Sequence, residues 1–154
     1  MKSSDQLAVH LVGVWDTPAL SLAGDGGYRL PLPEASGRLV YTTSGYLIAS
    51  VSMSQPAVTE SGSTLMPRFL SYSGRFEVAN GNWVLHHVDV SSLPSWVDTT
   101  VRRQALIDGD TLRLDTPPFR SDGREVIMRV QWTRAGGTPD DARLRAGRPS
   151  PRRI

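Results

Sequence analysis

Residues 124–134 read Arg-Glu-Val-Ile-Met-Arg-Val-Gln-Trp-Thr-Arg, and the alternation within this run indicates the architecture of the chain. One set of alternate positions holds Val126, Met128, Val130 and Trp132, and the other holds Glu125, Ile127, Arg129, Gln131 and Thr133. Successive side chains of a β-strand point to opposite faces, so this period of two predicts a half-buried strand. We expect one face to look into a core and the other to meet water.

Other short β-rich runs precede this strand in the sequence, and tight turns separate them. Turn pairs occur at Asp25-Gly26, Ser44-Gly45, Asn80-Gly81, Asp108-Gly109 and Asp122-Gly123, and Asn-Gly and Asp-Gly tolerate the positive φ of hairpin turns. Between them lie β-rich runs over 9–15, 28–32, 38–43, 46–53, 73–79, 82–91, 100–107, 111–115 and 124–134. The spacing predicts an all-β fold of about eight to ten antiparallel strands. Such a sheet loses its unpaired edges most simply by closing into a single barrel, which can hold one small ligand.

Residues 54–71 interrupt this pattern, because they are rich in Ser, Pro and Gly. Leu65, Phe69 and Tyr72 are spaced at i, i+4 and i+7, which is typical of a short helix. The alternative is a loop that tucks Phe69 into the core. Either element could cover one end of the barrel.

The charge distribution divides the chain into three parts. Residues 1–8 form an N-terminal extension, 9–134 the barrel domain, and 135–154 a tail rich in Arg, Pro and Gly. The tail composition predicts disorder, because it offers little apolar surface to bury. Residues 1–134 hold 12 basic and 13 acidic side chains, so the domain is not basic and no nucleic-acid partner is expected.

Several functional classes are excluded by what the sequence lacks. The chain has no cysteine, which excludes thiolate metal sites and cysteine nucleophiles. It has no apolar run long enough for a membrane helix, and Met1–Gln6 lack the apolar region of a signal peptide, so we expect a cytoplasmic protein without a membrane span. His86 and His87 are adjacent and would point to opposite faces of a strand, so no metal is expected, and no cofactor-binding motif is present.

Two strands carry candidate polar groups for a barrel interior. If Val84, Val88 and Val90 face inward, His86 does too and His87 faces outward, although the opposite parity is also possible. His86 is then either an acid–base group or a satisfied core histidine. Arg103 shares its face with apolar neighbours, so it is either a polar anchor for a ligand or an exposed arginine.

Several motifs resemble the small lipocalin-like domain proteins of bacteria and fungi. Gly13-Val14-Trp15 resembles the Gly-x-Trp of lipocalins, whose tryptophan closes the barrel base beneath an arginine that Arg134 could supply. Three further segments resemble motifs of the same family, namely Leu39–Tyr46, Tyr72–Val78 and the stretch from His86-His87-Val88 to Pro94-Ser95-Trp96-Val97. The resemblance covers about residues 11–134 and implies a closed calyx for an apolar small molecule. Ala105 stands where the family commonly has a bulky residue, which predicts a roomier interior.

The resemblance implies two functions for this calyx. The first is a cofactor-free cyclase or isomerase of natural-product biosynthesis, including enzymes that catalyse pericyclic [4+2]-type ring closure. The second is a non-catalytic small-molecule carrier. A structural module whose barrel is filled by side chains is a separate, third possibility. The candidate catalytic donors are Arg103, His86, Tyr46 and Tyr41. The candidate ligand-binding residues are Phe76, Trp96, Ala105, Met128, Trp132, Phe69 and His87. The expected partner is a hydrophobic small molecule, and the protein is expected to be a monomer or homodimer.

Overall fold

A computed structural model describes residues 4–136, and ten antiparallel strands form its main sheet. The strands are β1 (Gly13–Gly24), β2 (Arg29–Pro31), β3 (Ala35–Tyr41), β4 (Tyr46–Met53), β7 (Phe69–Ala79), β8 (Trp83–Ser91), β9 (Thr100–Asp108), β10 (Thr111–Asp115), β11 (Phe119–Ser121) and β12 (Arg124–Arg134). A separate hairpin is formed by β5 (Ala57–Val58) and β6 (Thr64–Met66). The helix α1 spans Ser4–Leu11, and short 3-10 turns span Asp25–Gly27 and Pro94–Trp96.

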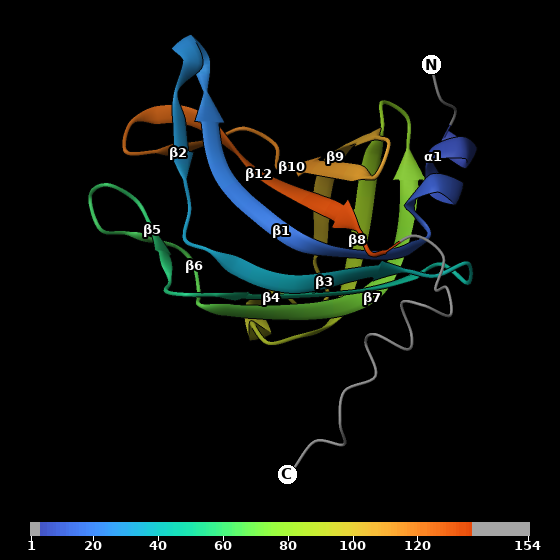
Figure 1. Cartoon of the computed structure of the whole chain (residues 1–154). Helices are drawn as coiled ribbons and strands as arrows, with labels where there is room; N and C mark the ends of the chain where they lie inside the picture. Colours follow the sequence, from blue (N-terminus) through green and yellow to red (C-terminus); the bar gives the residue numbers. More distant parts are fainter. Residues whose placement is uncertain (1–3, 137–154) are drawn as a thin grey trace.

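The sheet closes on itself because β1 pairs with β3 on one side and with β12 on the other (Figure 1). Neighbouring strands of the barrel otherwise follow one another along the chain. The exceptions are the short β2 and β11 strands, which extend β1 and β12, and the separate β5–β6 hairpin, which lies between β4 and β7 in the chain. The prediction of a single closed antiparallel barrel is therefore confirmed. Its inward positions carry the buried apolar side chains, as the alternation of Val126, Met128 and Trp132 predicted.

The N-terminus differs from the sequence prediction. Residues 4–11 form α1, whereas an extension over 1–8 and a strand beginning at residue 9 were expected. Leu7 and Leu11 lie one helical turn apart and are both buried against the barrel. The indole Nε1 of Trp15 donates a hydrogen bond of 2.9 Å to the carbonyl of Leu11. The helix is thus held by contacts with the barrel, which sequence periodicity does not reveal.

The segment 54–71 contains the β5–β6 hairpin and no helix, so the helical prediction is wrong. The loop alternative placed Phe69 in the core, and this too is wrong, because Phe69 starts β7 and is 52% exposed. Leu70 takes the inward position instead, since neighbouring residues of a strand face opposite ways. The hairpin tip is tied to the β11–β12 turn through Ser61, whose hydroxyl and amide both donate to Asp122.

A bulge between β7 and β8 changes the direction of one predicted side chain. The register shifts between Ser73 and Gly74, where a Cβ atom would overlap the backbone oxygen of His87. Beyond the bulge Val90 turns outward and is 63% exposed, so its predicted inward position is wrong. His86, before the bulge, keeps the inward direction.

No helix among residues 4–136 has the length and apolar character needed to span a membrane. The cytoplasmic location stays a prediction. Residues 137–154, which make up most of the tail predicted to be disordered, lie outside the described residues.

Candidate functional site

The barrel encloses a cavity of about 190 Å³ whose wall is mainly apolar. Leucine, valine and methionine side chains from β1, β3, β4, β7, β10 and β12 provide most of this wall. The polar side chains that border it include Tyr72 on β7, His86 on β8 and Arg103 on β9. An apolar pocket with a few fixed polar groups is the usual composition of a small-molecule site.

Trp15 and Arg134 close one end of the barrel. At the closed end the Arg134 guanidinium lies 4.0 Å from the ring centre of Trp15, and Arg134 also donates to the carbonyls of His10 and Val12. The predicted Trp15–Arg134 closure is therefore confirmed. The β5–β6 hairpin lies at the opposite end of the barrel (Figure 1), and its Leu65 and Met66 contribute to the cavity wall.

His86 is fixed between two tyrosines in the barrel interior. Its Nε2 lies 2.7 Å from the hydroxyl of Tyr41, and its Nδ1 lies 2.8 Å from the hydroxyl of Tyr72. Burial, reinforced by the nearby charges of Arg103 and His87, lowers the pKa of His86 to about 3. The imidazole is therefore neutral near pH 7, and of the two parities that the sequence left open, the structure has His86 facing inward.

Burial also keeps the two tyrosines neutral. It raises the pKa of Tyr41 well above its ordinary value and raises that of Tyr72, while the positive charge of Arg103 acts in the opposite direction on both. Both phenols keep their O–H hydrogens at physiological pH. His86, Tyr41 and Tyr72 are accordingly neutral hydrogen-bonding groups, and one cation lies near them.

Arg103 supplies that cation. It is half-buried, borders the cavity, and has its pKa lowered by burial, yet a guanidinium stays charged in proteins. Its Nη1 donates 2.8 Å to the backbone oxygen of Arg102. Within residues 4–136 no ion pair joins Arg103 to an Asp or Glu. Of the two alternatives for Arg103, the structure has the inward one, because Arg103 lies on the same face as the buried Val101 and Ala105.

Five further predicted site residues lie inside the barrel, at different depths. Trp96, Met128 and Trp132 border the cavity. Phe76 packs edge-on against Tyr41 with ring centres 4.7 Å apart, and Ala105 is buried in the core, but neither borders the cavity. Ala105 therefore does not enlarge this space directly.

Three predicted site residues lie on the outer face of the barrel instead. Tyr46 is 41% exposed and stacks against Arg75 on the outer surface, because Leu47 takes the inward position of β4. His87 contacts Glu77 at 2.7 Å and Thr100 at 3.0 Å, both outside the barrel. Phe69 faces outward as described above. These side chains cannot reach a ligand in the cavity, so their assignment to the site is corrected.

Tyr72 was not among the predicted site residues, although it borders the cavity and contacts His86. A signal for it was present in the sequence. Leu70, Tyr72 and Gly74 occupy alternate positions of one strand, so an inward Leu70 places Tyr72 inward as well.

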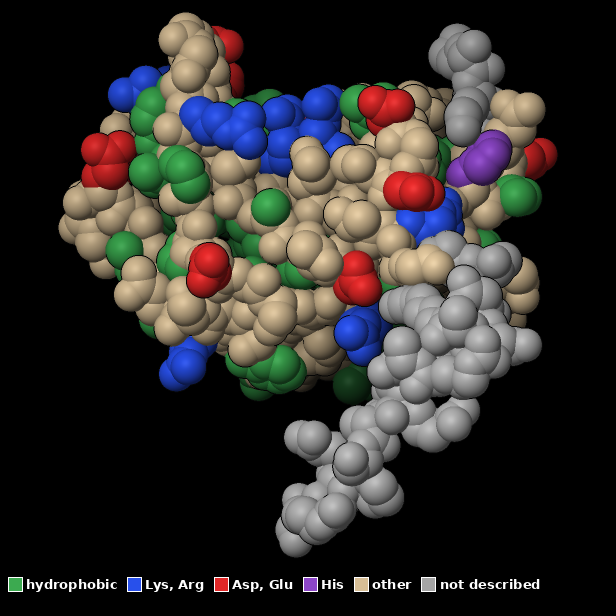
Figure 2. Space-filling view, in the orientation of Figure 1, with side chains coloured by type: hydrophobic (Ala, Val, Ile, Leu, Met, Phe, Trp, Pro, Cys, Tyr) green, Lys and Arg blue, Asp and Glu red, His purple; other side chains and the backbone are tan. Residues whose placement is uncertain are grey.

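A second, larger hollow of about 820 Å³ lies on the outer side of the barrel, where β1 and β3 diverge. Arginines occur in its wall, and Figure 2 shows arginine side chains gathered on this face. Two of these arginines are already engaged, since Arg68 donates to the carbonyl of Met53 and Arg129 forms two hydrogen bonds with Asp115. The third, Arg29, is exposed to solvent, so none of the described arginines in this wall is a buried cation without a partner.

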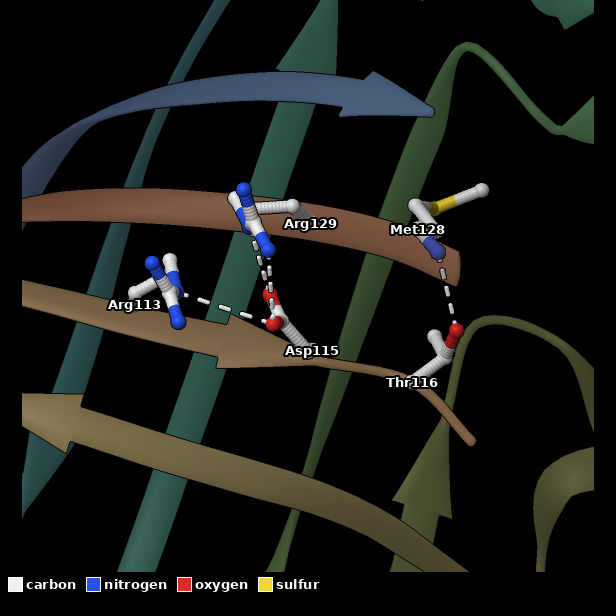
Figure 3. Close-up of polar contacts among 5 residues, drawn as sticks. All are labelled: Arg113, Asp115, Thr116, Met128 and Arg129. Carbon is white, nitrogen blue, oxygen red and sulfur yellow. Dashed lines mark hydrogen bonds and ion pairs between the residues drawn. The ribbon is translucent and has the colours of Figure 1, made fainter. Parts of the chain in front are cut away.

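The cavity wall near β10 and β12 is held together by polar contacts at the strand ends (Figure 3). The hydroxyl of Thr116 accepts a hydrogen bond of 2.9 Å from the amide of Met128. On the outer face Asp115 is bound by Arg129 and, at 3.6 Å, by Arg113. These contacts fix the two cavity-lining residues Thr116 and Met128 relative to each other.

The sequence profile of the lipocalin-like domain matches residues 12–135, which are almost the whole of the described barrel. The chain belongs to the lipocalin-like domain family. This lipocalin-like chain is similar to the 4'-hydroxy-3'-methoxypropiophenone carrier protein of Aspergillus oryzae, with 39% identity over 75 residues that cover 44% of this chain and 68% of that protein. A solved structure, the lipoprotein YedD from Klebsiella pneumoniae, covers 91% of this chain and 88% of its own, with 14% identity and a TM-score of 0.39.

Proposed function

We propose that the lipocalin-like barrel binds one small, largely apolar molecule through an acceptor oxygen held by Arg103, and that it acts as a carrier. The observation that supports this most strongly is a guanidinium bordering an apolar cavity without a carboxylate partner in the described chain. A charge removed from water is costly unless it is paired. A ligand oxygen would supply the missing partner.

The cavity is large enough to hold about one ring. An apolar cavity of about 150 Å³ is enough to hold benzene, and this cavity measures about 190 Å³. A long polyene or polyketide is larger than this volume and would extend beyond the cavity. The related carrier is named for a single-ring aryl ketone that also bears a hydroxyl and a methoxy group, and the parent ketone propiophenone is apolar apart from its one carbonyl oxygen. We therefore take aryl ketones as the first ligands to test.

The second candidate is the cyclase or isomerase implied by the family resemblance. It is favoured by the Arg103 guanidinium beside neutral O–H donors, because a cation and O–H donors together polarise a conjugated carbonyl. His86 is a poor general acid near pH 7, since its pKa is about 3. Any catalysis would then rest on Arg103 and on substrate shape.

The test begins with native mass spectrometry of freshly purified protein, which shows whether a small molecule is bound. The protein is then denatured, and the extracted small molecules are incubated with fresh protein. A bound molecule that is released and recovered unchanged supports the carrier, whereas conversion of an added precursor into an isomer of equal mass supports the enzyme. Binding of propiophenone is then measured by calorimetry.

Arg103→Met should weaken that binding about tenfold or more, as expected for a charge-assisted hydrogen bond. Arg102→Met is the matched control, because Arg102 stacks on Trp83 outside the barrel at 4.4 Å. Equal loss in both variants, or no loss in Arg103→Met, would refute the role given to Arg103.

A further inference from the structure

The hydrogen-bond partners of His86 allow the positions of three hydrogens to be assigned. A neutral imidazole has one N–H donor and one acceptor nitrogen, and each phenol has one O–H donor. Both nitrogens of His86 contact a tyrosine hydroxyl. One tyrosine therefore donates to His86 and the other accepts from it. The accepting tyrosine keeps a hydrogen that is free for another acceptor.

The surroundings of the two tyrosines decide which of them keeps the free hydrogen. Tyr41 is 1% exposed and does not border the cavity, and within residues 4–136 its hydroxyl has no hydrogen-bond partner other than His86. A free O–H at Tyr41 would be buried without an acceptor, which is costly. Tyr72 borders the cavity, where a ligand can accept its hydrogen. We therefore expect Tyr41 to donate its hydrogen to Nε2 of His86, and the imidazole hydrogen to be on Nδ1.

We propose that His86 is held as the Nδ1–H tautomer by Tyr41, and that this directs the Tyr72 O–H into the cavity as a second donor for the ligand oxygen beside Arg103. This rests on the proposed binding function and specifies its ligand class. Tyr72 and Arg103 both donate, so the oxygen they hold must accept twice, as a carbonyl oxygen does with its two lone pairs. Tyr41 is a positioning residue, because it acts on the ligand only through His86 and Tyr72.

The tautomer is tested without any ligand. Two-bond ¹H–¹⁵N correlation spectra of the protein at pH 7 distinguish the nitrogen that carries hydrogen from the one that accepts. We expect Nδ1 of His86 to be protonated and Nε2 to be the acceptor. In Tyr41→Phe the donor to Nε2 is lost, and the Nδ1–H fraction should fall. An Nε2–H tautomer in the unaltered protein would overturn the assignment.

The donor role of Tyr72 is tested with two probes of the same shape, propiophenone and propylbenzene, which differ in the carbonyl. Tyr72→Phe should weaken propiophenone binding about two- to tenfold, the effect of one hydrogen bond, and leave propylbenzene binding unchanged. Tyr41→Phe should also weaken only the ketone, although Tyr41 does not border the cavity. A merely structural effect would change the affinity for both probes equally.

Tyr46→Phe is the matched control, because Tyr46 lies on the outer face and should affect neither probe. Unchanged ketone affinity in Tyr72→Phe would overturn the proposal while leaving Arg103 as the binding group. If neither probe binds the unaltered protein, the proposed function fails for this ligand class, and the tautomer measurement still decides the hydrogen-bond assignment.

Discussion

Lowering the pH should reduce the stability of this barrel already at pH values above those at which carboxylates titrate. The cause is His86, whose pKa is lowered to about 3 in the folded protein, chiefly by burial, from an ordinary value of 6.5. Between these two pH values the unfolded chain binds a proton at this side chain and the folded chain does not. Stability is thus fully present above about pH 6.5 and is lost as the pH falls toward 3.

The size of this effect follows from the two pKa values. Between pH 7 and pH 5 the free energy of unfolding should fall by about 2 kcal/mol from His86 alone. The result depends little on the folded value, because at pH 5 a group with a pKa near 3 is still almost entirely neutral. Asp and Glu have ordinary pKa values near 4, so most of their titration lies below this window.

Urea denaturation at pH 7, 6 and 5 measures the effect, with His86→Gln and His87→Gln as a matched pair. His86→Gln should remove most of the pH dependence whatever its effect on stability at pH 7. His87→Gln should keep it, because His87 lies on the outer face. A free energy of unfolding that stays constant from pH 7 to pH 5 in the unaltered protein would refute the buried neutral imidazole.

Three further predictions concern the barrel base, the bulge and the cavity. Arg134→Ala should lower the free energy of unfolding by about 2 kcal/mol, measured by urea denaturation, because it removes the stacking on Trp15 and two hydrogen bonds to carbonyls. Gly74→Ala should lower the free energy of unfolding by more than about 3 kcal/mol, because the added Cβ atom would overlap backbone atoms. Gly109→Ala should lower it by about 1 kcal/mol, because only the positive φ of that residue opposes a side chain. Equal losses in the two variants would contradict the close backbone approach at Gly74. Ala49→Phe should fill the cavity and abolish propiophenone binding in calorimetry while circular dichroism shows an intact barrel, and retained binding would place the ligand elsewhere.

The sequence predicted the barrel well because its signals are local. Alternation over 124–134 and the turn pairs define antiparallel strands without reference to distant residues. Strand parity also made His86 and Arg103 candidates for the interior, but it left an outward His86 and an exposed Arg103 open, and the structure decides for the inward alternative in both cases. Strand parity could also have excluded Tyr46, since Leu47, Ala49, Val51 and Met53 occupy the inward positions of β4.

The features that the sequence did not predict depend on contacts between distant segments. Helix α1 has only eight residues, and buried contacts of Leu7 and Leu11 with the barrel hold it in place. The outward turn of Val90 follows from a bulge, and a bulge depends on how two strands pair. The contact of Tyr72 with His86 joins β7 to β8, so strand parity alone could not assign the hydrogen bond.

The most direct test of ligand binding inside the barrel is a crystal structure of the protein with propiophenone. We predict that the ring lies among the apolar side chains of the interior cavity and that the carbonyl oxygen accepts hydrogen bonds from Arg103 and Tyr72. A molecule bound only in the outer hollow between β1 and β3, or an interior that stays empty at saturating ligand, would contradict the account.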